Sequence, residues 1–487
     1  MTFALLTLFA LFLMFKGSTA LFSDTDAGWH IRNGERILAM GSLPHADPFS
    51  FSKPNAPWVA WEWGSDVAMG AIYQRGGMAG VALLYGLAIA ASVWMWFRVT
   101  RAVGGSFLIA SLFFVPMLST TTVHWLARPH IFSWLFLLGT IWLCERMPQR
   151  LKWWHMALVF IAMSLWANLH ASFLMAPGIA AIYSFGAWLT PMIWESAVAR
   201  DWRKYALLAF VTLPGTLVNP SGGKLHQHVF EYLTNSALLD RISEFQSFDF
   251  RQHGAGWIIL CLAICFIGGC AGLAVRRPER FLLSLLITAM ALQSVRVLPL
   301  AALVLLPLAC GSITEVLKTM RGLAPGLRGR LDAALNYSDQ LQSIEKSCGG
   351  YAIVPFAAVL IVAAIAGNAG FAQGDAPVNA AYAVEKLPAT ARVFSTDSFG
   401  GYLIFRFAGE RKVFFDGRSD FYGAEFTDRY LKMVSVHPGW RDEFNRWNFT
   451  NALLPPNSAL AAALEANGWR ALYRDKTAVL LAGGSKL

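Results

Sequence analysis

Charged side chains are scarce in this 487-residue chain, because Asp, Glu, Lys and Arg together make up only 14% of it. Soluble domains have roughly 25%. That scarcity excludes a soluble enzyme and a disordered chain. The six cysteines form neither a disulfide framework nor a CxxC metal knuckle, which excludes a disulfide-knotted secreted module. No basic stripe is interleaved with aromatic residues, so we expect no nucleic-acid partner.

Apolar sequence takes the place of charge: 56% of the residues are hydrophobic, and the mean hydropathy is +0.46. An apolar run of about 20 residues is long enough to cross a bilayer as a helix. The chain is therefore expected to be mostly α, with a polytopic membrane domain at residues 1–370. We count eleven candidate spans: 3–22, 78–97, 104–123, 129–146, 153–170, 172–193, 205–219, 256–275, 280–297, 298–317 and 350–370.

The first run could also be a signal peptide, since Ser18-Thr19-Ala20 resembles a cleavage site. A signal peptide normally has a basic segment before its apolar core, and none is present here. We therefore favour an uncleaved first helix, with Lys16 reaching outward.

Positive charge is concentrated in alternate short loops between these runs, for example around Arg146–Lys152 and Arg276–Arg280. Residues 1–370 have 26 Lys and Arg against 18 Asp and Glu, whereas residues 371–487 have 14 against 12. Basic loops stay in the cytoplasm. The pattern predicts a cytoplasmic N-terminus and, after eleven spans, an extracytoplasmic domain at residues 371–487.

Two outer loops are long, at residues 23–77 and 219–255. Within the first, residues 28–40 and 63–75 have the periodicity of short amphipathic helices. Three tryptophans in the same loop suggest that it lies along the membrane interface: Trp58, Trp61 and Trp63.

The C-terminal part has the pattern of a small α/β domain. Strands are expected at 392–396, 401–407, 411–416 and 450–454, helices at 423–436 and 458–467, and a closing hairpin at 470–482. Residues 416–420 read Asp-Gly-Arg-Ser-Asp. This motif is either a turn held by an Asp–Arg pair or a lid over an outer cavity.

Two carboxylates directly follow the first span, at Asp24 and Asp26. Partial burial beside the membrane would raise the pKa of such a group. It could then take a proton from a hydroxyl group, or help to bind a divalent cation. The alternative is that Asp26 caps the helix that begins near Gly28, while Asp24 is solvated.

Further polar residues recur where other spans reach the same membrane face. Each alone could be a hydrogen-bonded packing residue. Ionisable groups at membrane depth are costly, however, so a group of them predicts a cavity. Arg128 and Arg296 could bind a lipid phosphate. The candidate substrate-binding residues are Trp29, His30, Arg128, His130, Asn168, His170, Glu244 and Arg296.

Several stretches resemble bacterial polytopic proteins similar to the GT-C glycosyltransferases, which include protein mannosyltransferases and lipid A aminoarabinose or galacturonic acid transferases. The resemblance rests on DTDAGWHIRNGERILAMGSLPHADPFSF, WVAWEWGSDV, RPHIFSW, WANLHASF, EFQSFDF, YLIFRF, KVFFDGRSDFYG and NALLPPNS, and spans nearly the whole chain. It implies a GT-C-like fold in the bacterial inner membrane. It also implies transfer of a hexose or pentose from a polyprenyl-phosphate donor to an envelope glycan, lipid or protein outside the cytoplasm.

In such enzymes an acidic residue just after the first span is the catalytic base, and Asp24 or Asp26 matches that position. The Asp-Glu pair of the mannosyltransferases is replaced here by Asp-Thr-Asp, so the resemblance does not select one of the two. It fixes no metal either; a divalent cation near Asp24 and Asp26 is the candidate cofactor.

The residue chemistry agrees with such a reaction. A carboxylate would activate the acceptor hydroxyl, which attacks the anomeric carbon with inversion. The leaving phosphate is already anionic and needs cations, for which Arg128, Arg296 and His130 are candidates. Two other classes stay open: a non-catalytic scaffold of an envelope-polysaccharide assembly system, and a transporter or flippase.

Overall fold

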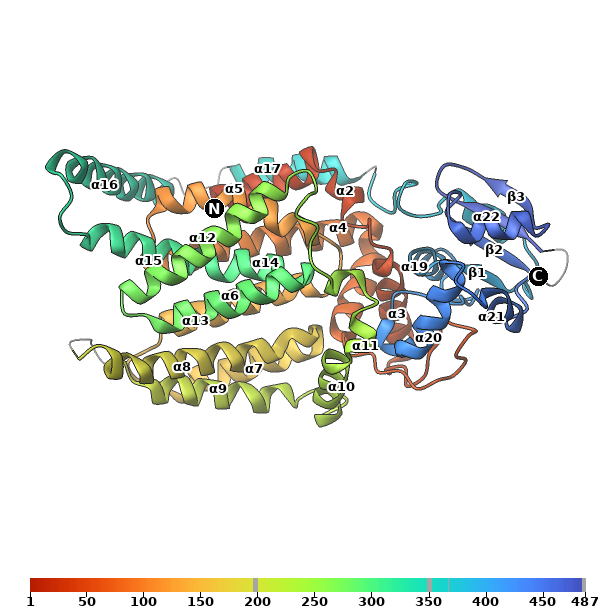
Figure 1. Ribbon diagram of the computed structural model, residues 1–487, viewed down its shortest axis with the longest axis horizontal. Helices are drawn as coiled ribbons and strands as arrows, with labels where there is room; N and C mark the ends of the chain where they lie inside the picture. The colour runs from red at the N-terminus through yellow and green to blue at the C-terminus, as the bar shows by residue number, and fades with distance from the viewer. Residues whose placement is uncertain (196–199, 348–352, 367, 484–487) are drawn as a thin grey trace.

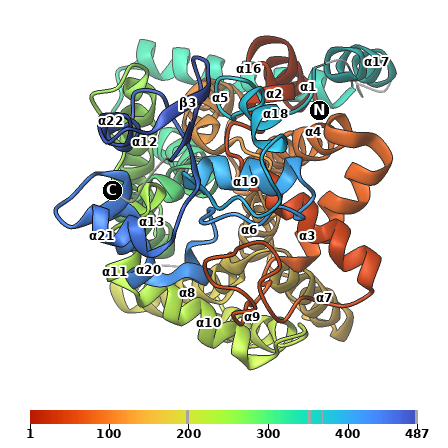
Figure 2. The same cartoon turned by 90° about the vertical axis from the view of Figure 1, so that its right-hand side faces the viewer.

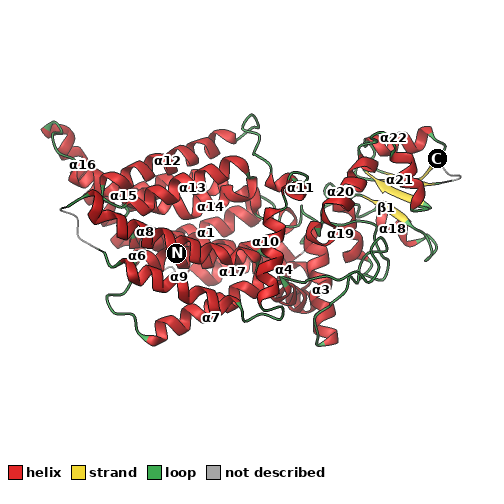
Figure 3. Cartoon of the chain, turned by 60° about the horizontal axis from the view of Figure 1, so that its bottom comes forward, coloured by secondary structure: helices red, strands yellow, loops and turns green. Residues whose placement is uncertain are grey.

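The computed structural model describes residues 1–195, 200–347, 353–366 and 368–483. The molecule is elongated, with a helical bundle at one end and a small domain containing strands at the other (Figure 1). All strands that the structure describes lie in that small domain (Figure 3). The chain is thus mostly helical, with a small C-terminal α/β domain, as the sequence predicts.

The bundle consists of helices that match the apolar runs. They are α4 Trp63–Ala102, α5 Phe107–Thr121, α6 His130–Glu145, α7 Trp153–Leu169, α8 Met175–Ile193, α9 Trp202–Thr216, α12 Ala255–Ala274, α13 Pro278–Gln293, α14 Leu298–Leu300, α15 Leu306–Thr319 and α17 Ile353–Ala366. Large apolar side chains are exposed on their outer faces, for example Leu112, Ile161, Phe210 and Ile267. Such faces suit hydrocarbon rather than water.

Five helical segments in the described part of the chain are long and apolar enough to cross a membrane: Trp63–Ala102, Phe107–His124, Ala171–Ile193, Ala255–Ala274 and Val295–Thr319. Three shorter apolar segments accompany them: Thr2–Met14, His130–Glu145 and Trp153–Leu169. The protein is therefore a membrane protein, whereas the count of eleven spans stays a prediction.

The first span is broken, in contrast to the single helix expected over residues 3–22. It comprises α1 Thr2–Phe9, a π-helical turn Ala10–Met14 and α2 Gly17–Ala20. The break falls at Lys16, whose backbone is left-handed with φ 51°. The next residue must be small, because a Cβ on Gly17 would lie 2.8 Å from the Leu11 carbonyl oxygen.

The first outer loop holds α3 Asp26–Met40, close to the predicted helix 28–40. The second expected helix of that loop, at 63–75, is present as the first part of α4 and precedes the next span. The two halves of α4 are joined by a kink at Gly77, with φ 57°. Glycine adopts this conformation without steric cost.

The three tryptophans of this loop make contacts inside the protein. Trp58 is buried, and Trp61 is half-buried and lines a cavity. The indole N–H of Trp63 donates to the Asn168 side-chain oxygen at 2.7 Å. The position of this loop along the membrane interface stays a prediction.

The C-terminal domain is built on a four-stranded sheet in the order β1-β2-β4-β3, formed by β1 Val393–Ser395, β2 Asn451–Leu454, β3 Arg470–Arg474 and β4 Val479–Ala482. β1 and β2 are parallel, and the other pairs are antiparallel. Five helices surround it: α18 Ala380–Glu385, α19 Asp397–Arg406, α20 Ser419–Val434, α21 Trp440–Arg446 and α22 Ala459–Ala466. The predicted hairpin and both predicted helices are present.

Two predicted strands are wrong. Residues 401–407 belong to helix α19, whose N-terminus is capped by the Thr396 hydroxyl, which accepts from the Phe399 N–H. Residues 411–416 form no strand and make a single bridge, between Val413 and Ser50 of the first outer loop. A short apolar run does not distinguish a buried helix from a strand by its pattern alone.

The first outer loop and the C-terminal domain share one hydrophobic core, to which the loop contributes Trp29, Phe49 and Trp58. Helix α3 packs directly on α19, since a Cβ on Gly28 would lie 2.6 Å from the Gly401 carbonyl oxygen. Seen along the long axis, α19 lies over the end of the bundle beside α3 (Figure 2). The predicted boundary at residues 370/371 stays a prediction.

Two further parts complete the chain. The second outer loop contains α10 Gly223–Thr234 and α11 Ser236–Leu239, beside the C-terminal domain (Figure 1). At the opposite end, α16 Pro325–Ser347 follows the bundle, in a stretch for which the sequence predicted no element. Of the six cysteines, Cys348 lies outside the described residues, and the other five are free thiols.

Candidate active site

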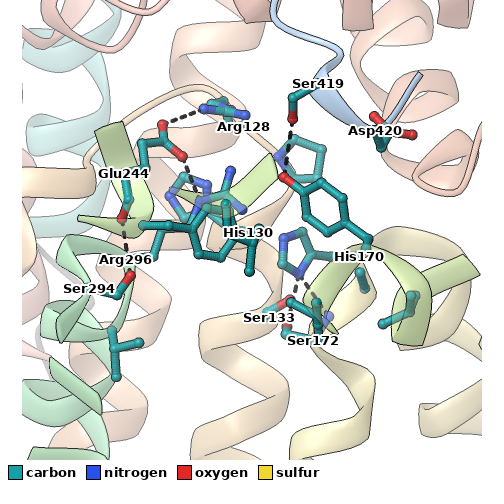
Figure 4. Close-up of a pocket in the computed structure, with 18 of the residues that line it drawn as sticks. Arg128, His130, Ser133, His170, Ser172, Glu244, Ser294, Arg296, Ser419 and Asp420 are labelled. Atoms are coloured by element: carbon teal, nitrogen blue, oxygen red, sulfur yellow. Dashed lines mark hydrogen bonds and ion pairs between the residues drawn. The ribbon is translucent and has the colours of Figure 1, made fainter. Parts of the chain in front are cut away.

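A cavity of about 880 Å³ lies where the bundle meets the C-terminal domain. Its wall combines residues of the first outer loop, the ends of several spans, helices α10 and α11, and the 417–420 segment. Charged and imidazole side chains from these separate parts of the chain point into it (Figure 4). The sequence predicted that such groups share a cavity at one membrane face.

Arg128 is the centre of a network of ion pairs at this cavity. Its Nη1 donates to Asp24 and to Glu244, both at 2.7 Å, and its Nη2 lies 3.2 Å from Asp26. Glu244 also accepts from Arg296 Nε at 2.6 Å, so that it stands between the two guanidinium groups (Figure 4). Four distant segments of the chain are joined in this way.

The protonation states of this network follow from burial and from these neighbours. Burial and the adjacent Asp24 carboxylate raise the pKa of Asp26 well above its usual value, against the opposing effect of Arg128. Burial would also raise the pKa of Glu244, but Arg128 and Arg296 outweigh it and hold that pKa well below its usual value. Glu244 is therefore an ionised bridge, whereas Asp26 holds a proton more readily.

Asp26 is the first residue of helix α3 and does not cap it, which corrects the alternative in which it does; the N-cap position is Thr25. The helix begins at Asp26, whose backbone N–H donates to Asp24 Oδ1 at 2.9 Å. The Asp26 carboxylate instead lies against Gly417, where a Cβ would come within 2.0 Å of Asp26 Oδ1. Both carboxylates are thus set behind Arg128, and neither is among the residues that line the cavity.

The structure places the other predicted site residues in two groups. Trp29, Arg128, His130, His170, Glu244 and Arg296 line the cavity. His30 and Asn168 are not among the residues that line it. The Asn168 amide donates to the carbonyl oxygens of Ser164 and Val218, both at 2.7 Å, and so joins the ends of α7 and α9.

Three carboxylates that line the cavity were missed in the sequence: Glu62, Asp240 and Asp420. Glu62 directly precedes α4, and burial together with the nearby Asp66 carboxylate raises its pKa to about 8. The signal was present in the sequence as an acidic residue between two tryptophans, in Trp61-Glu62-Trp63. Asp420 belongs to the 416–420 motif, whose lid alternative already pointed to the cavity.

That motif proves to be both a paired turn and part of the cavity wall. Arg418 is buried and pairs with Asp416 and Asp47, each at 2.7 Å. Its guanidinium also lies over the rings of Trp58 and Phe421, 4.8 and 4.9 Å from their centroids. The anchored turn holds Ser419 and Asp420 over the cavity.

Helix α10, in the second outer loop, packs against this turn. His228 Nε2 lies 3.3 Å from Asp420, and the Tyr232 hydroxyl lies 3.2 Å from that of Ser419. Arg241 and Asp428 form a further ion pair between the same two parts of the chain. The C-terminal domain and the second outer loop thus cover the cavity together.

The remaining wall is apolar. Trp134, Leu174, Met175, Met290 and Leu300 line it, from α6, α8, α13 and α14. Met290 is also 44% exposed on the bundle surface, so the cavity reaches that surface at α13. An apolar channel beside a charged centre suits a ligand with a polar head and a hydrocarbon chain.

The divalent cation suggested for Asp24 and Asp26 stays a prediction. In the described part of the chain, no three His, Cys, Asp or Glu side chains meet in a group that could hold a metal ion. The position between the two carboxylates and Glu244 is taken by the Arg128 guanidinium.

The fold is shared with the oligosaccharyltransferase AglB of the archaeon Archaeoglobus fulgidus. Its structure in complex with an inhibitory peptide and a dolichol-phosphate matches with a TM-score of 0.56 and 11% sequence identity, over 93% of this chain and 68% of AglB. The form tethered to an acceptor peptide containing the NVT sequon matches over the same shares, with a TM-score of 0.53 and 12% identity. These two matches confirm the GT-C-type fold expected from the sequence resemblance.

ArnT from Cupriavidus metallidurans, bound to undecaprenyl phosphate, aligns over 99% of this chain and 96% of its own, with a TM-score of 0.48 and 15% identity. No protein-family model matches the chain, and no curated protein sequence does. The fold assignment therefore rests on AglB.

Proposed function

We propose that this protein is a membrane glycosyltransferase that moves a sugar from a polyprenyl-phosphate donor to an acceptor outside the cytoplasm. The observation that supports it is the cavity, in which a guanidinium and imidazole centre adjoins an apolar channel that reaches the bundle surface. AglB has the same fold and was solved with a dolichol-phosphate, which has this combination of head and chain. A shared fold does not imply a shared function, so the proposal rests on the residues of the cavity.

The donor phosphate would bind at Arg296. Arg128 is already shared among three carboxylates, whereas Arg296 pairs with Glu244 through Nε alone. Its side chain is 34% exposed at the cavity. A guanidinium with free N–H groups binds phosphate oxygens strongly. His130 and His170 line the same wall, but the N–H of a neutral His130 is taken by the His124 carbonyl oxygen, 3.0 Å from Nε2, so Arg296 is the donor to the phosphate.

The lipid chain would follow the apolar wall past Met175 and Leu300 and leave the protein beside Met290. The sugar would then lie toward Trp29, Trp58 and Trp61, since aromatic rings pack well against the apolar faces of sugars. The acceptor would enter beneath α10 and the 417–420 segment. The hexose or pentose, the acceptor and the lipid carrier are not selected by these contacts.

The membrane orientation belongs to the same proposal. The cavity lies at the bundle end that adjoins the C-terminal domain, and α16 lies at the other end (Figure 1). Loops with many basic residues, such as 146–152 and 276–280, lie at the α16 end. By the positive-inside rule that end would be cytoplasmic. Transfer would then occur on the outer side of the bacterial inner membrane.

Mass spectrometry of envelope lipids and glycans from a deletion strain would test the function. We expect one decoration to disappear and its lipid-linked donor to accumulate, and both to be reversed by the wild-type gene. An unchanged envelope, or loss of the decoration together with donor confined to the cytoplasmic leaflet, would contradict a transferase; the second result would indicate a flippase.

A further inference from the structure

A chain of four polar side chains leads from the packed interior between α3 and α4 to the cavity. Asp66 Oδ1 lies 2.6 Å from His30 Nδ1. His30 Nε2 faces Glu62 Oε2 at 3.9 Å, and Glu62 Oε1 faces His170 Nε2 at 3.5 Å. Only Glu62 and His170 line the cavity, while His30 and Asp66 are fully buried behind them.

The inner half of this chain is held rigidly by close packing of α3 on α4. A Cβ on Gly34 would lie 1.8 Å from the Asp66 carbonyl oxygen, and one on Gly70 would lie 2.5 Å from the Glu35 backbone nitrogen. The helices therefore touch through their backbones. Asn33 Nδ2 donates to the second Asp66 oxygen at 2.6 Å, so both oxygens of Asp66 have a fixed hydrogen-bond partner.

The two imidazoles present different groups to Glu62. Burial and the Arg128 charge lower the pKa of His30 well below its usual value, so the ring is neutral. His30 Nδ1 lies 2.6 Å from Asp66 Oδ1, and His30 Nε2 is buried and has no hydrogen-bond partner. His170 Nδ1 accepts from the Ser172 N–H at 3.1 Å, so its proton is on Nε2. Glu62 thus faces an unpaired ring nitrogen of His30 and the N–H of His170.

The aspartates predicted as the base have a different environment. Asp24 and Asp26 both contact Arg128, and Asp24 also accepts the Asp26 N–H. Neither lines the cavity. A carboxylate held by a guanidinium is stabilised as the anion and is a weaker proton acceptor. Glu62 contacts no guanidinium among the described ion pairs and lines the cavity directly.

We propose that Glu62 accepts the proton of the acceptor hydroxyl in the transfer reaction, and that His30 and Asp66 are positioning residues behind it. This inference rests on the proposed function. The acceptor oxygen forms a bond to the anomeric carbon while the bond from that carbon to the phosphate oxygen breaks. The bonding electron pair leaves with the phosphate, which departs as polyprenyl phosphate. The hydroxyl proton passes to the Glu62 carboxylate, one oxygen of which faces His30 Nε2 at 3.9 Å.

The charges around Glu62 set the pH at which it can act. The titratable and charged groups that face it are His30, Asp66, Arg128, His170, Arg296 and Asp420. Burial and Asp66 raise its pKa to about 8, against Arg128 and Arg296. A base must be ionised, so transfer should rise with pH through about 8. A general base with a pKa near the working pH combines availability with proton affinity.

The test is the rate at which the decoration lost in the deletion strain is restored in membrane vesicles, which contain endogenous donor and acceptor, measured from pH 6 to pH 9. We expect Glu62→Gln to lower the rate roughly 10²–10⁴-fold and Glu62→Asp to retain part of it, with the rise in rate moved along the pH axis. His30→Asn should lower the rate less and also move the rise. The matched control is Glu231→Gln, which removes an exposed carboxylate of α10 that does not line the cavity.

Native mass spectrometry with undecaprenyl phosphate as the probe separates a catalytic loss from a loss of folding. We expect Glu62→Gln to bind it as the wild type does, and Glu62→Asp supplies the comparison if the Gln variant yields little folded protein. Wild-type rates in both Glu62 variants, or an unmoved pH profile in Glu62→Asp, would overturn the assignment while leaving the transferase intact. Absence of any transfer by the wild type would overturn both.

Discussion

Two networks of buried ion pairs lie at opposite ends of helix α6, about 22 Å apart by its length. The cavity network joins Asp24, Asp26 and Glu244 to Arg128 and Arg296. The distal network joins Glu145 and Glu279 to Arg200, Arg277 and Arg280. The residue types are the same, but only the first network contributes to the cavity wall.

The difference lies in how completely each network is paired. In the distal network the carboxylates are almost fully buried: Glu145 accepts from Arg277 and Arg280 at 2.9 and 3.0 Å and from the Tyr183 hydroxyl at 2.8 Å. In the cavity network carboxylates are in excess, and Arg296 keeps an exposed guanidinium edge. The distal network thus joins helices, whereas the cavity network can still bind an anion.

Glu145→Gln should give the largest change, and it should be a change in stability. It would leave the buried Arg280 guanidinium without its carboxylate and Arg277 with Glu279 alone, which costs about 3–5 kcal/mol. Thermal unfolding in detergent, followed by tryptophan fluorescence, measures it. Glu315→Gln, an exposed glutamate on α15, is the matched control. An unchanged unfolding temperature in Glu145→Gln would show that the distal network is not structural.

Arg296→Gln, in contrast, should lower the rate of transfer and leave the stability almost unchanged. Loss of the cation for the leaving phosphate should lower transfer about 10²–10³-fold. The unfolding temperature should hardly change, because the side chain is 34% exposed. Arg251→Gln removes an exposed arginine of the second outer loop that does not line the cavity, and should keep full activity. If Arg296→Gln instead lost stability and kept its rate of transfer, Arg296 would be a structural residue, like the arginines of the distal network.

Asp24→Asn and Asp26→Asn should lower transfer less than the roughly 10²-fold that loss of a general base costs. Asp26 already has a raised pKa, so its amide variant resembles the protonated form. The wild-type pH profile should persist in both variants. A rate loss that equals or exceeds that of Glu62→Gln, with a flat pH profile, would restore the aspartates as the base.

Gly417→Ala tests whether the position of the 417–420 segment over the cavity depends on its contact with Asp26. The added methyl would meet Asp26 Oδ1 at 2.0 Å, so the turn or the carboxylate must move. Overpacking of this kind costs about 1–3 kcal/mol. Hydrogen exchange should become faster in residues 416–424. Exchange in the helix ends joined by the distal network should stay as in the wild type. Equal exchange in both proteins would mean that the turn adapts freely.

Arg241→Gln should have the smallest effect. Its ion pair with Asp428 joins the second outer loop to α20, but both side chains are partly exposed. Exposed pairs contribute about 0–1 kcal/mol. The unfolding temperature should therefore remain within about 4 °C of the wild type, since a large domain shifts about 2–4 °C per kcal/mol. A larger drop would mean that this contact closes the cavity.

The sequence predicted more of the bundle than of the outer domain. Apolar runs placed the helices of the bundle, because lipid requires long apolar segments whatever their neighbours. The strand predicted at 401–407 is wrong, because Thr396 caps a helix there and that helix packs closely on α3. Neither contact is visible in an apolar pattern.

The candidate site was predicted in the same uneven way. Arg128, Glu244 and Arg296 were identified because charge is costly at membrane depth, and the structure brings them together. Glu62 was overlooked because its surroundings come from residues distant in sequence: His170 is more than 100 positions away. Pairing across such distances depends on tertiary packing, so spacing along the chain gave no sign of it.

The most direct test of the central claim is an experimental structure of the protein with undecaprenyl phosphate bound. The account predicts the phosphate within hydrogen-bond distance of Arg296 and the chain along Met175, Met290 and Leu300. A phosphate bound elsewhere, with the cavity filled by protein side chains, would contradict the proposal that this cavity is the transfer site.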